Sequence, residues 1–270
     1  MMVSEKTLHF ISGLPRSGST LLCNVLAQNP RFYATQTSGM LDVLFNVRNQ
    51  WDNLIEMKAM DPALSEQRKL AVLRGIMVNF YADVEQPVIF DKSRGWLAHL
   101  EMLEALLQQP ARVLVPVRDL RDVLASFEKL HRATSATRQL AAENADYLGF
   151  QTVEQRLAHW VKFDQPVGLA YNRIKDALQR GWRDRMHFVD YDKLCRTPRR
   201  VLQDCYEFLG ETWYEHDFDH VEQVTWEDDR VHGFAAGALH GIRSEVRPQY
   251  AQWPTVLGRA ADLYQGQEVW

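Results

Sequence analysis

The chain has 270 residues, 46% of them hydrophobic, and a formal net charge of −4. A chain with this length and hydrophobic content can bury one substantial core, and the length is compatible with a single α/β domain or with two small ones. The slightly acidic balance provides no global basic field, so we expect neither nucleic acid nor an anionic membrane as a partner. Any anionic ligand must therefore be bound by a local group of side chains and backbone donors.

The cysteines and the N-terminus indicate the compartment. Cys23, Cys195 and Cys205 are widely spaced and form no CxxC pair, so neither a disulfide framework nor a zinc site is expected. The first residues lead into a short apolar strand rather than into the apolar centre of a signal peptide, and no apolar run approaches the roughly 18–20 residues that span a bilayer. We therefore predict a cytoplasmic protein without a metal site.

Along the chain, short apolar runs alternate with segments of helical periodicity. The runs predicted to be buried strands are 8–12, 87–90, 112–117 and 187–191. The predicted helices are 20–28, 39–58, 65–83, 96–108, 120–131, 153–180 and 198–209. Near-continuous apolar strands in this alternation predict an α/β fold of the P-loop type, a mostly parallel sheet with helices on both faces, in a single domain over residues 1–270.

Two segments have weaker patterns. Residues 133–151 are rich in Ala, Ser, Thr and Asn, and we predict a mobile excursion there. A lid over the acceptor site and a plain surface loop both remain open for this segment. Residues 211–255 show poor periodicity and are predicted to be an irregular cap near the C-terminus.

The stretch GLPRSGST, residues 13–20, follows the first predicted strand and begins a helix. Gly13 and Gly18 have the spacing of a Walker A loop, GxxxxGK[ST], but Ser19 stands where that loop has its lysine. In a kinase the lysine neutralises charge on the phosphates during transfer. The backbone N–H groups and the hydroxyls still predict an anion site. A ligand with a terminal anionic anhydride is expected here.

The sequence PRSGSTLL resembles the 5′-phosphosulfate loop of sulfotransferases that use 3′-phosphoadenylyl sulfate (PAPS), most closely that of the tyrosylprotein and bacterial branches. A second family motif is an arginine followed eight residues later by a serine, and Arg118 and Ser126 match it. The resemblance implies that this pair holds the 3′-phosphate of PAPS, which a guanidinium can bind bidentately. The loop residues that it implies for the 5′ end are Pro15, Arg16, Ser17, Gly18, Ser19 and Thr20. A surface ion pair of Arg118 with Asp119 or Asp122 is the alternative.

Three looser likenesses follow in the family's order. In VIFDKSRGW, Lys92 takes the place of the family's lysine at a strand end, which is thought to assist transfer. In MHFVDYDKL, Tyr191 takes the place of a residue beside the adenine. In HGIRSEVRP, Arg247 and, to a lesser extent, Arg243 resemble the late loop over the nucleotide. The resemblance covers about residues 8–250.

The general base is where the chain departs from the family pattern. The strand-end histidine of the cytosolic members is replaced by Arg94, and the glutamate of the tyrosylprotein branch aligns without gaps with Thr37. Asp91 and Asp42 are the candidates that the residues offer, because one lies at the sheet edge and the other in the adjacent segment. An acidic acceptor could react without a strong base.

The function predicted from these motifs is transfer of a sulfuryl group from PAPS to a hydroxyl or similar group of a small-molecule or peptide acceptor. We expect an in-line, metal-independent reaction in which Lys92 and Arg16 stabilise the leaving oxygen. A P-loop kinase of a small metabolite and a non-catalytic nucleotide-binding scaffold are the alternatives.

Overall fold

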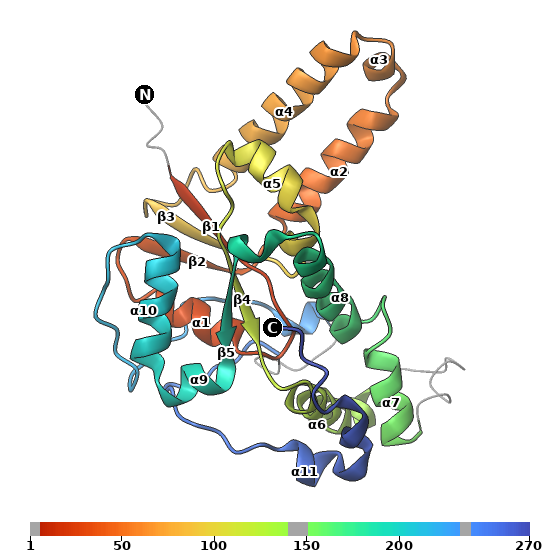
Figure 1. The fold of residues 1–270 in the computed structure, drawn as a ribbon, viewed down its shortest axis with the longest axis vertical. Helices are drawn as coiled ribbons and strands as arrows, with labels where there is room; N and C mark the ends of the chain where they lie inside the picture. Colours follow the sequence, from red (N-terminus) through yellow and green to blue (C-terminus); the bar gives the residue numbers. More distant parts are fainter. Residues whose placement is uncertain (1–5, 140–150, 233–238) are drawn as a thin grey trace.

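The computed structural model describes residues 6–139, 151–232 and 239–270. Its centre is a five-stranded sheet in the order β2-β3-β1-β4-β5, and all neighbouring strands are parallel. The strands are β1 (Thr7–Ile11), β2 (Phe32–Thr37), β3 (Val88–Lys92), β4 (Val113–Val117) and β5 (Met186–Asp190). Parallel neighbours require crossover connections, and helices accordingly cover both faces of the sheet (Figure 1). The predicted single-domain α/β fold is confirmed.

The two faces of the sheet carry separate cores, because successive residues of a strand point to opposite sides. Ile11 packs with the side of α1 (Ser19–Leu26), α9 (Tyr191–Arg196) and α10 (Pro198–Leu209). Phe10 packs on the other side. The helices of that side are α5 (Leu100–Leu107), which follows the 3₁₀ turn η1 (Trp96–His99), α6 (Leu120–Gln139), α7 (Val153–Trp160) and α8 (Pro166–Gln179), followed by η3 (Trp182–Arg185).

A helical hairpin projects from one end of the sheet (Figure 1). It consists of α2 (Met40–Asn53), the single turn α3 (Ile55–Lys58) and α4 (Pro62–Asn79). The helix predicted over 39–58 is interrupted at Leu54, whose backbone is extended. The next helix begins earlier than predicted, because the Asp61 side chain accepts a hydrogen bond from the Leu64 N–H and caps it.

The strand β2 was not predicted from the sequence. It pairs with β3 only and forms the edge of the sheet, and its last two residues, Gln36 and Thr37, are exposed. An edge strand with a polar end lacks the continuous apolar run by which the buried strands were found.

The helix predicted over 153–180 is two helices, α7 and α8. Pro166 begins α8 and has no N–H with which to continue an earlier helix. A Cβ on Gly168 would lie 2.1 Å from the Lys162 carbonyl oxygen, so the connection packs tightly on the new helix. The prediction of one long helix was wrong because packing between the two segments decided the break.

The segments with weak patterns differ in what the structure describes. Helix α6 continues to Gln139 rather than ending at His131, and 140–150 lie outside the described residues, so the lid over 133–151 stays a prediction. Between α10 and α11 (Trp253–Val256) the described chain has only the 3₁₀ turn η4 (Asp229–His232), and η5 (Gly258–Tyr264) follows α11. The described residues between α10 and α11 are therefore mainly irregular, and a cap over 211–255 stays a prediction.

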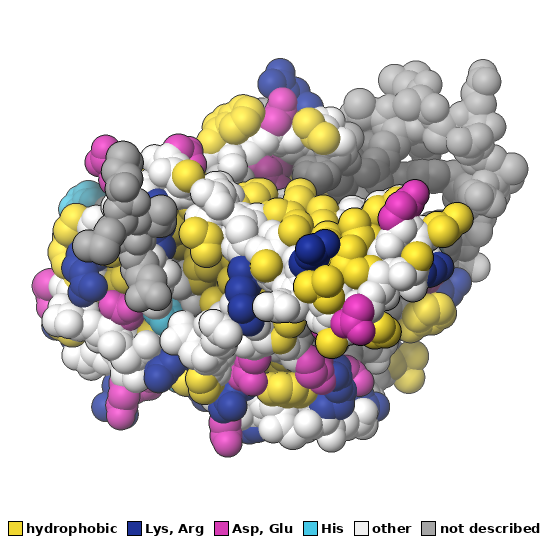
Figure 2. Space-filling model, turned by 90° about the horizontal axis from the view of Figure 1, so that it is seen from above, with side chains coloured by type: hydrophobic (Ala, Val, Ile, Leu, Met, Phe, Trp, Pro, Cys, Tyr) yellow, Lys and Arg dark blue, Asp and Glu magenta, His cyan; other side chains and the backbone are white. Residues whose placement is uncertain are grey.

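Charges of both signs share the surface, and the cysteines are not paired. Figure 2 shows basic and acidic side chains interspersed over one face of the molecule rather than separated by sign. Cys23, Cys195 and Cys205 are free and buried. None of the helices described is both long and apolar enough to cross a membrane. Location in the cytoplasm stays a prediction.

Candidate active site

The loop between β1 and α1 lies against the end of β4. Leu14 N–H donates to the Pro116 carbonyl over 2.9 Å, and a Cβ on Gly13 would lie 2.2 Å from that same oxygen. Only glycine permits this approach. The buried Ser17 hydroxyl is 2.6 Å from the Leu14 carbonyl and 3.0 Å from the Pro116 carbonyl. Its hydrogen bonding holds the loop in shape, and the side chain does not line the cavity described below.

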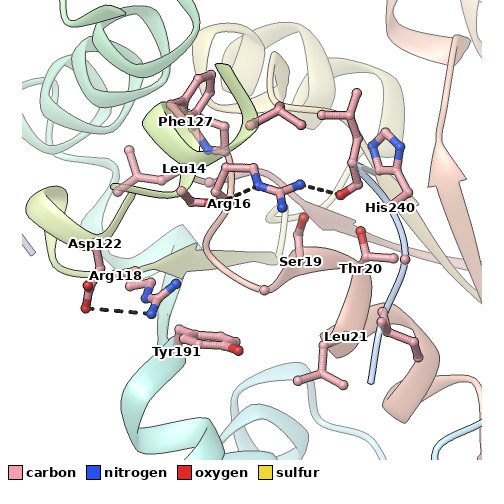
Figure 3. A pocket seen from close by; sticks show the side chains of 18 of the residues that line it. Leu14, Arg16, Ser19, Thr20, Leu21, Arg118, Asp122, Phe127, Tyr191 and His240 are labelled. Atoms are coloured by element: carbon pink, nitrogen blue, oxygen red, sulfur yellow. Dashed lines mark hydrogen bonds and ion pairs between the residues drawn. The ribbon is translucent and has the colours of Figure 1, made fainter. Parts of the chain in front are cut away.

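The N-terminus of α1 opens toward this cavity. Gly18 has φ +81°, and a Cβ there would lie 2.3 Å from the Tyr191 ring, so this position also requires glycine. Helix α1 has neither a side-chain cap nor an acidic residue in its first turn. Its first N–H groups and its positive dipole end thus remain available to an anion. The Ser19 and Thr20 hydroxyls point toward Arg16 (Figure 3).

Arg16 joins three parts of the site. Its Nε donates to Ser126 Oγ over 3.0 Å, and its guanidinium also donates to the Leu239 carbonyl (Figure 3). Burial lowers the pKa of Arg16, the Arg118 charge adds to this effect, and the Asp229 carboxylate opposes it. Arg16 itself has φ +58°, an uncommon backbone conformation for a residue with a side chain. The loop therefore holds this cation in a defined place.

Arg118 follows β4 and lies over the Tyr191 ring, with its guanidinium carbon 4.5 Å from the ring centre. Its Nη2 is 3.6 Å from Asp122 Oδ2, whereas its buried Nε has no hydrogen-bond partner among the described residues. The Tyr191 hydroxyl accepts a hydrogen bond from Gln249 Nε2 over 3.0 Å. The surface ion pair considered for Arg118 exists as a loose contact, but Arg118 is only 9% exposed and lines the cavity.

A single cavity of about 910 Å³ collects these groups. The predicted site residues that line it are Pro15, Arg16, Gly18, Ser19, Thr20, Lys92, Arg118, Ser126, Tyr191, Arg243 and Arg247. Arg247 pairs with Glu245 over 2.5 Å and is largely exposed. The two motifs, more than a hundred residues apart in the chain, thus face one space.

The two candidate bases do not face this space. Asp91 is fully buried, and its carboxylate accepts hydrogen bonds from Trp96 Nε1 over 2.7 Å and from the Tyr81 hydroxyl. Burial raises the pKa of the Asp91 carboxyl, and its hydrogen-bond donors oppose that effect. Asp42 lies in the first turn of α2 and is exposed. The alternation of side chains along β3 explains why Asp91 is buried, because Lys92 faces the cavity and its neighbour must point the other way.

Glu227 and His240 are among the residues of the cavity wall that sequence reasoning missed. Glu227 Oε2 accepts a hydrogen bond from the Thr37 N–H over 3.1 Å, and His240 Nε2 is 3.4 Å from the same oxygen. Both come from the irregular loop. No motif marks Glu227, and His240 begins the stretch HGIRSEVRP, in which only the arginines were singled out. Thr37, the position that aligns with the family's glutamate, was the single hint that a carboxylate belongs there.

The described part of the chain contains no group of three or more His, Cys, Asp or Glu side chains arranged to hold a metal ion. The polar groups that face the cavity are mainly Lys and Arg cations, hydroxyls and backbone donors. This composition suits a large anionic ligand.

A family model described as the sulfotransferase family matches residues 9–215. The chain belongs to the sulfotransferase family. It is a sulfotransferase enzyme, so the kinase and the non-catalytic scaffold are set aside. No curated protein matches the sequence.

Solved structures with a similar fold are sulfotransferases as well. The sulfotransferase domain from the curacin biosynthetic pathway is 18% identical, with a TM-score of 0.59, over 96% of this chain and 97% of that one. The domain from the Synechococcus PCC 7002 olefin synthase is 21% identical, with a TM-score of 0.47, over 97% and 95%. A sulfotransferase from Alicyclobacillus acidocaldarius is 16% identical, with a TM-score of 0.45, over 78% and 84%. At these identities the likeness concerns the fold.

Proposed function

We propose that this sulfotransferase takes its sulfuryl group from PAPS, transfers it in line to a hydroxyl or similar acceptor, and releases 3′-phosphoadenosine 5′-phosphate. The observation that carries the proposal is the meeting of two anion-binding groups in one cavity. The loop at α1 offers N–H groups, hydroxyls and Arg16, and the end of β4 offers Arg118 and Ser126. A nucleotide with phosphates at both ends of its ribose has the charge pattern that such an arrangement binds.

The unpartnered Nε of Arg118 supports the assignment of the 3′-phosphate to the part of the cavity at the end of β4. A buried guanidinium N–H without an acceptor costs free energy, and a phosphate oxygen would supply the acceptor. Tyr191, which contacts Arg118 and lines the cavity, is the residue that we assign to a place beside the adenine. We assign Arg243 and Arg247 of the late loop to further phosphate contacts.

Lys92 and Arg16 are the cations proposed to act in the transfer. In the reaction the acceptor oxygen forms a bond to sulfur, and the bond from sulfur to the bridging oxygen of the 5′-phosphate breaks, leaving its electron pair on that oxygen. A fixed cation stabilises the charge that develops there. Lys92 is 7% exposed and lines the cavity, so little water competes for that interaction. We expect turnover without added Mg²⁺ for this reason.

Calorimetry without Mg²⁺ tests the donor assignment. We expect 3′-phosphoadenosine 5′-phosphate to bind more tightly than AMP, and ATP to bind weakly. Arg118→Gln should remove most of the preference for the 3′-phosphate, roughly 10- to 100-fold. Arg200→Gln is the matched control, because Arg200 is exposed and pairs with Asp204 on the surface of α10. Equal affinity for AMP and the bisphosphate in the unaltered protein would refute the proposal.

A further inference from the structure

Three side chains of the irregular loop form a connected chain that ends in the cavity. The Asp229 carboxylate is fully buried, and its Oδ1 lies 2.5 Å from His240 Nδ1. His240 Nε2 lies 3.4 Å from Glu227 Oε2. His240 and Glu227 both line the cavity, with side chains 20% and 13% exposed. The chain runs from a buried carboxylate, through an imidazole, to a carboxylate beside the site.

Asp229 holds the histidine in one orientation. Its Oδ2 accepts hydrogen bonds from the N–H groups of Leu239 and His240, over 2.8 and 3.3 Å. Burial acts to raise the pKa of Asp229, but these hydrogen bonds outweigh it, and the pKa is lowered. An ionised Asp229 accepts the Nδ1–H of the ring and so selects that tautomer. Nε2 is then the atom through which His240 exchanges a proton with Glu227.

Glu227 and Lys92 line the same cavity from different elements of the fold. The Thr37 N–H donates to Glu227 Oε2 over 3.1 Å, and Thr37 is the register partner of Lys92 across β2 and β3. Successive N–H groups of a strand point to opposite sides, and the Ser38 N–H donates to the Lys92 carbonyl. The Glu227 carboxylate therefore lies on the outer side of β2, at the end of the strand next to the one that carries Lys92.

The pKa directions of two nearby groups agree with this neighbourhood. Burial raises the pKa of the Cys23 thiol to about 11, and the charges that act on it include Lys92, which lowers it, and Glu227, which raises it. In the cavity wall, partial loss of water lowers the pKa of Arg94, and Glu227 opposes this shift. The Glu227 carboxylate thus acts on Cys23 of α1 and on Arg94, two residues after Lys92.

We propose that Glu227 is the general base of the transfer and that His240 and Asp229 are its positioning residues. This inference rests on the proposed function. As the acceptor oxygen bonds to sulfur, its O–H bond breaks and the proton passes to the Glu227 carboxylate. His240 Nε2 lies within reach of that proton. The carboxylate lies beside the Thr37 backbone, although it comes from a segment 190 residues away.

The inference also names a class of acceptor. A base contributes most when the acceptor is a neutral hydroxyl that must lose its proton during attack, as in an aliphatic alcohol, and least when the acceptor is already acidic. The structure therefore assigns to this enzyme weakly acidic hydroxyl acceptors.

The test compares Glu227→Gln with the unaltered protein and with Asp228→Asn. Asp228 is the adjacent carboxylate, but it pairs with Arg230 and does not line the cavity. Radiolabelled PAPS is supplied with a series of acceptors of rising acidity, from an aliphatic alcohol through phenol to p-nitrophenol, with transfer to water as the baseline. Calorimetry measures how tightly each variant binds 3′-phosphoadenosine 5′-phosphate and so whether its donor site is intact.

Glu227→Gln should bind the bisphosphate within about twofold of the unaltered protein, since Gln keeps the size of the side chain. Its transfer rate to the alcohol should fall about 10²- to 10⁴-fold, with a smaller loss for p-nitrophenol. His240→Gln should lower the rate less. The double variant should be little worse than Glu227→Gln alone, because residues that act as a unit are not additive. Asp228→Asn should behave as the unaltered protein.

Several outcomes would overturn the inference. Unchanged rates in Glu227→Gln for every acceptor would do so, as would an equal loss for all acceptors regardless of acidity, which marks a structural role. Binding of the bisphosphate without transfer to any acceptor, water included, would also overturn it. If the unaltered protein does not bind the bisphosphate, the proposed function fails first, and the calorimetry distinguishes this case from the others.

Discussion

Arg16 Nε donates a hydrogen bond to Ser126 Oγ over 3.0 Å, and this bond joins two motifs 110 residues apart in the chain. The loop at the end of β1 and the helix after β4 are neighbours because β1 and β4 are adjacent parallel strands. Their carboxyl ends meet at one edge of the sheet, where ligands of α/β proteins commonly bind. The bond fixes the positions of Arg16 and Ser126 relative to each other.

Ser126→Ala should weaken binding of 3′-phosphoadenosine 5′-phosphate about tenfold, because one hydrogen bond to a charged group contributes roughly 1.5 kcal/mol. AMP, which lacks the 3′-phosphate, should lose much less affinity. Calorimetry with both nucleotides measures the difference, and Ser65→Ala, in the projecting hairpin, is the control. An equal loss for both nucleotides would instead assign Ser126 to the support of Arg16.

Lys92→Ala should lower kcat about 10²- to 10³-fold and raise KM for PAPS much less, as expected of a contact made mainly in the transition state. Lys175→Ala, at an exposed position on α8, should change neither constant. Steady-state kinetics with PAPS as the varied substrate provide the measurement. A variant with unchanged kcat would remove Lys92 from the mechanism.

Gly18→Ala should abolish nucleotide binding and lower the melting temperature. The new Cβ would collide with the Tyr191 ring and force a residue with a side chain into φ +81°. Gly75→Ala is an instructive control, because that glycine lies inside α4 with open space around it. There the substitution should stabilise the protein by about 0.5–1 kcal/mol. Thermal unfolding of both variants tests the pair, and a stable, nucleotide-binding Gly18→Ala would contradict the geometry.

Asp91→Asn should destabilise the fold by about 1–3 kcal/mol, since the buried carboxylate accepts hydrogen bonds from Trp96 and Tyr81. The fraction that remains folded should keep near-normal kcat, and Asp42→Asn should be nearly neutral in both respects. Urea unfolding and kinetics on the same samples separate the two effects. A large fall in kcat with unchanged stability would restore Asp91 as a candidate base.

Stability should fall as the pH decreases from about 6.5 to 4, in part because of His216. Burial lowers its folded-state pKa to about 4, whereas the unfolded chain keeps a value near 6.5. In this window the unfolded state binds more protons, so stability is full above the unfolded value and is lost toward the folded one. The shift corresponds to at most roughly 3 kcal/mol.

Urea unfolding as a function of pH tests this prediction. His216→Gln should flatten the curve between pH 6.5 and 4. His220→Gln is the control, because His220 lies only four residues away but is exposed. It should leave the curve unchanged. Parallel curves for all three proteins would show that His216 does not titrate in this way.

Much of the fold follows from local patterns. The predicted strands β1, β3 and β4 are almost entirely buried and are therefore apolar runs that a sequence reveals. Strand β5 was also predicted, although it forms the other edge of the sheet and is only partly buried. Strand β2 was missed because an edge pairing depends on a neighbour distant in the chain. The break between α7 and α8 was missed because the tight packing of the short connection on Gly168 shows only in the structure, although Pro166 marks the place in the sequence.

The sequence by itself determined the family, the parallel α/β fold and the cations and hydroxyls of both motifs, because each motif is a short run whose spacing carries its chemistry. Only the tertiary structure decided that Ser17 faces its own loop, that Asp91 points into the core, and that Glu227 reaches the N–H of Thr37. These are consequences of which way a side chain points and of which distant segment packs against it. Neither is written in the spacing of neighbouring residues.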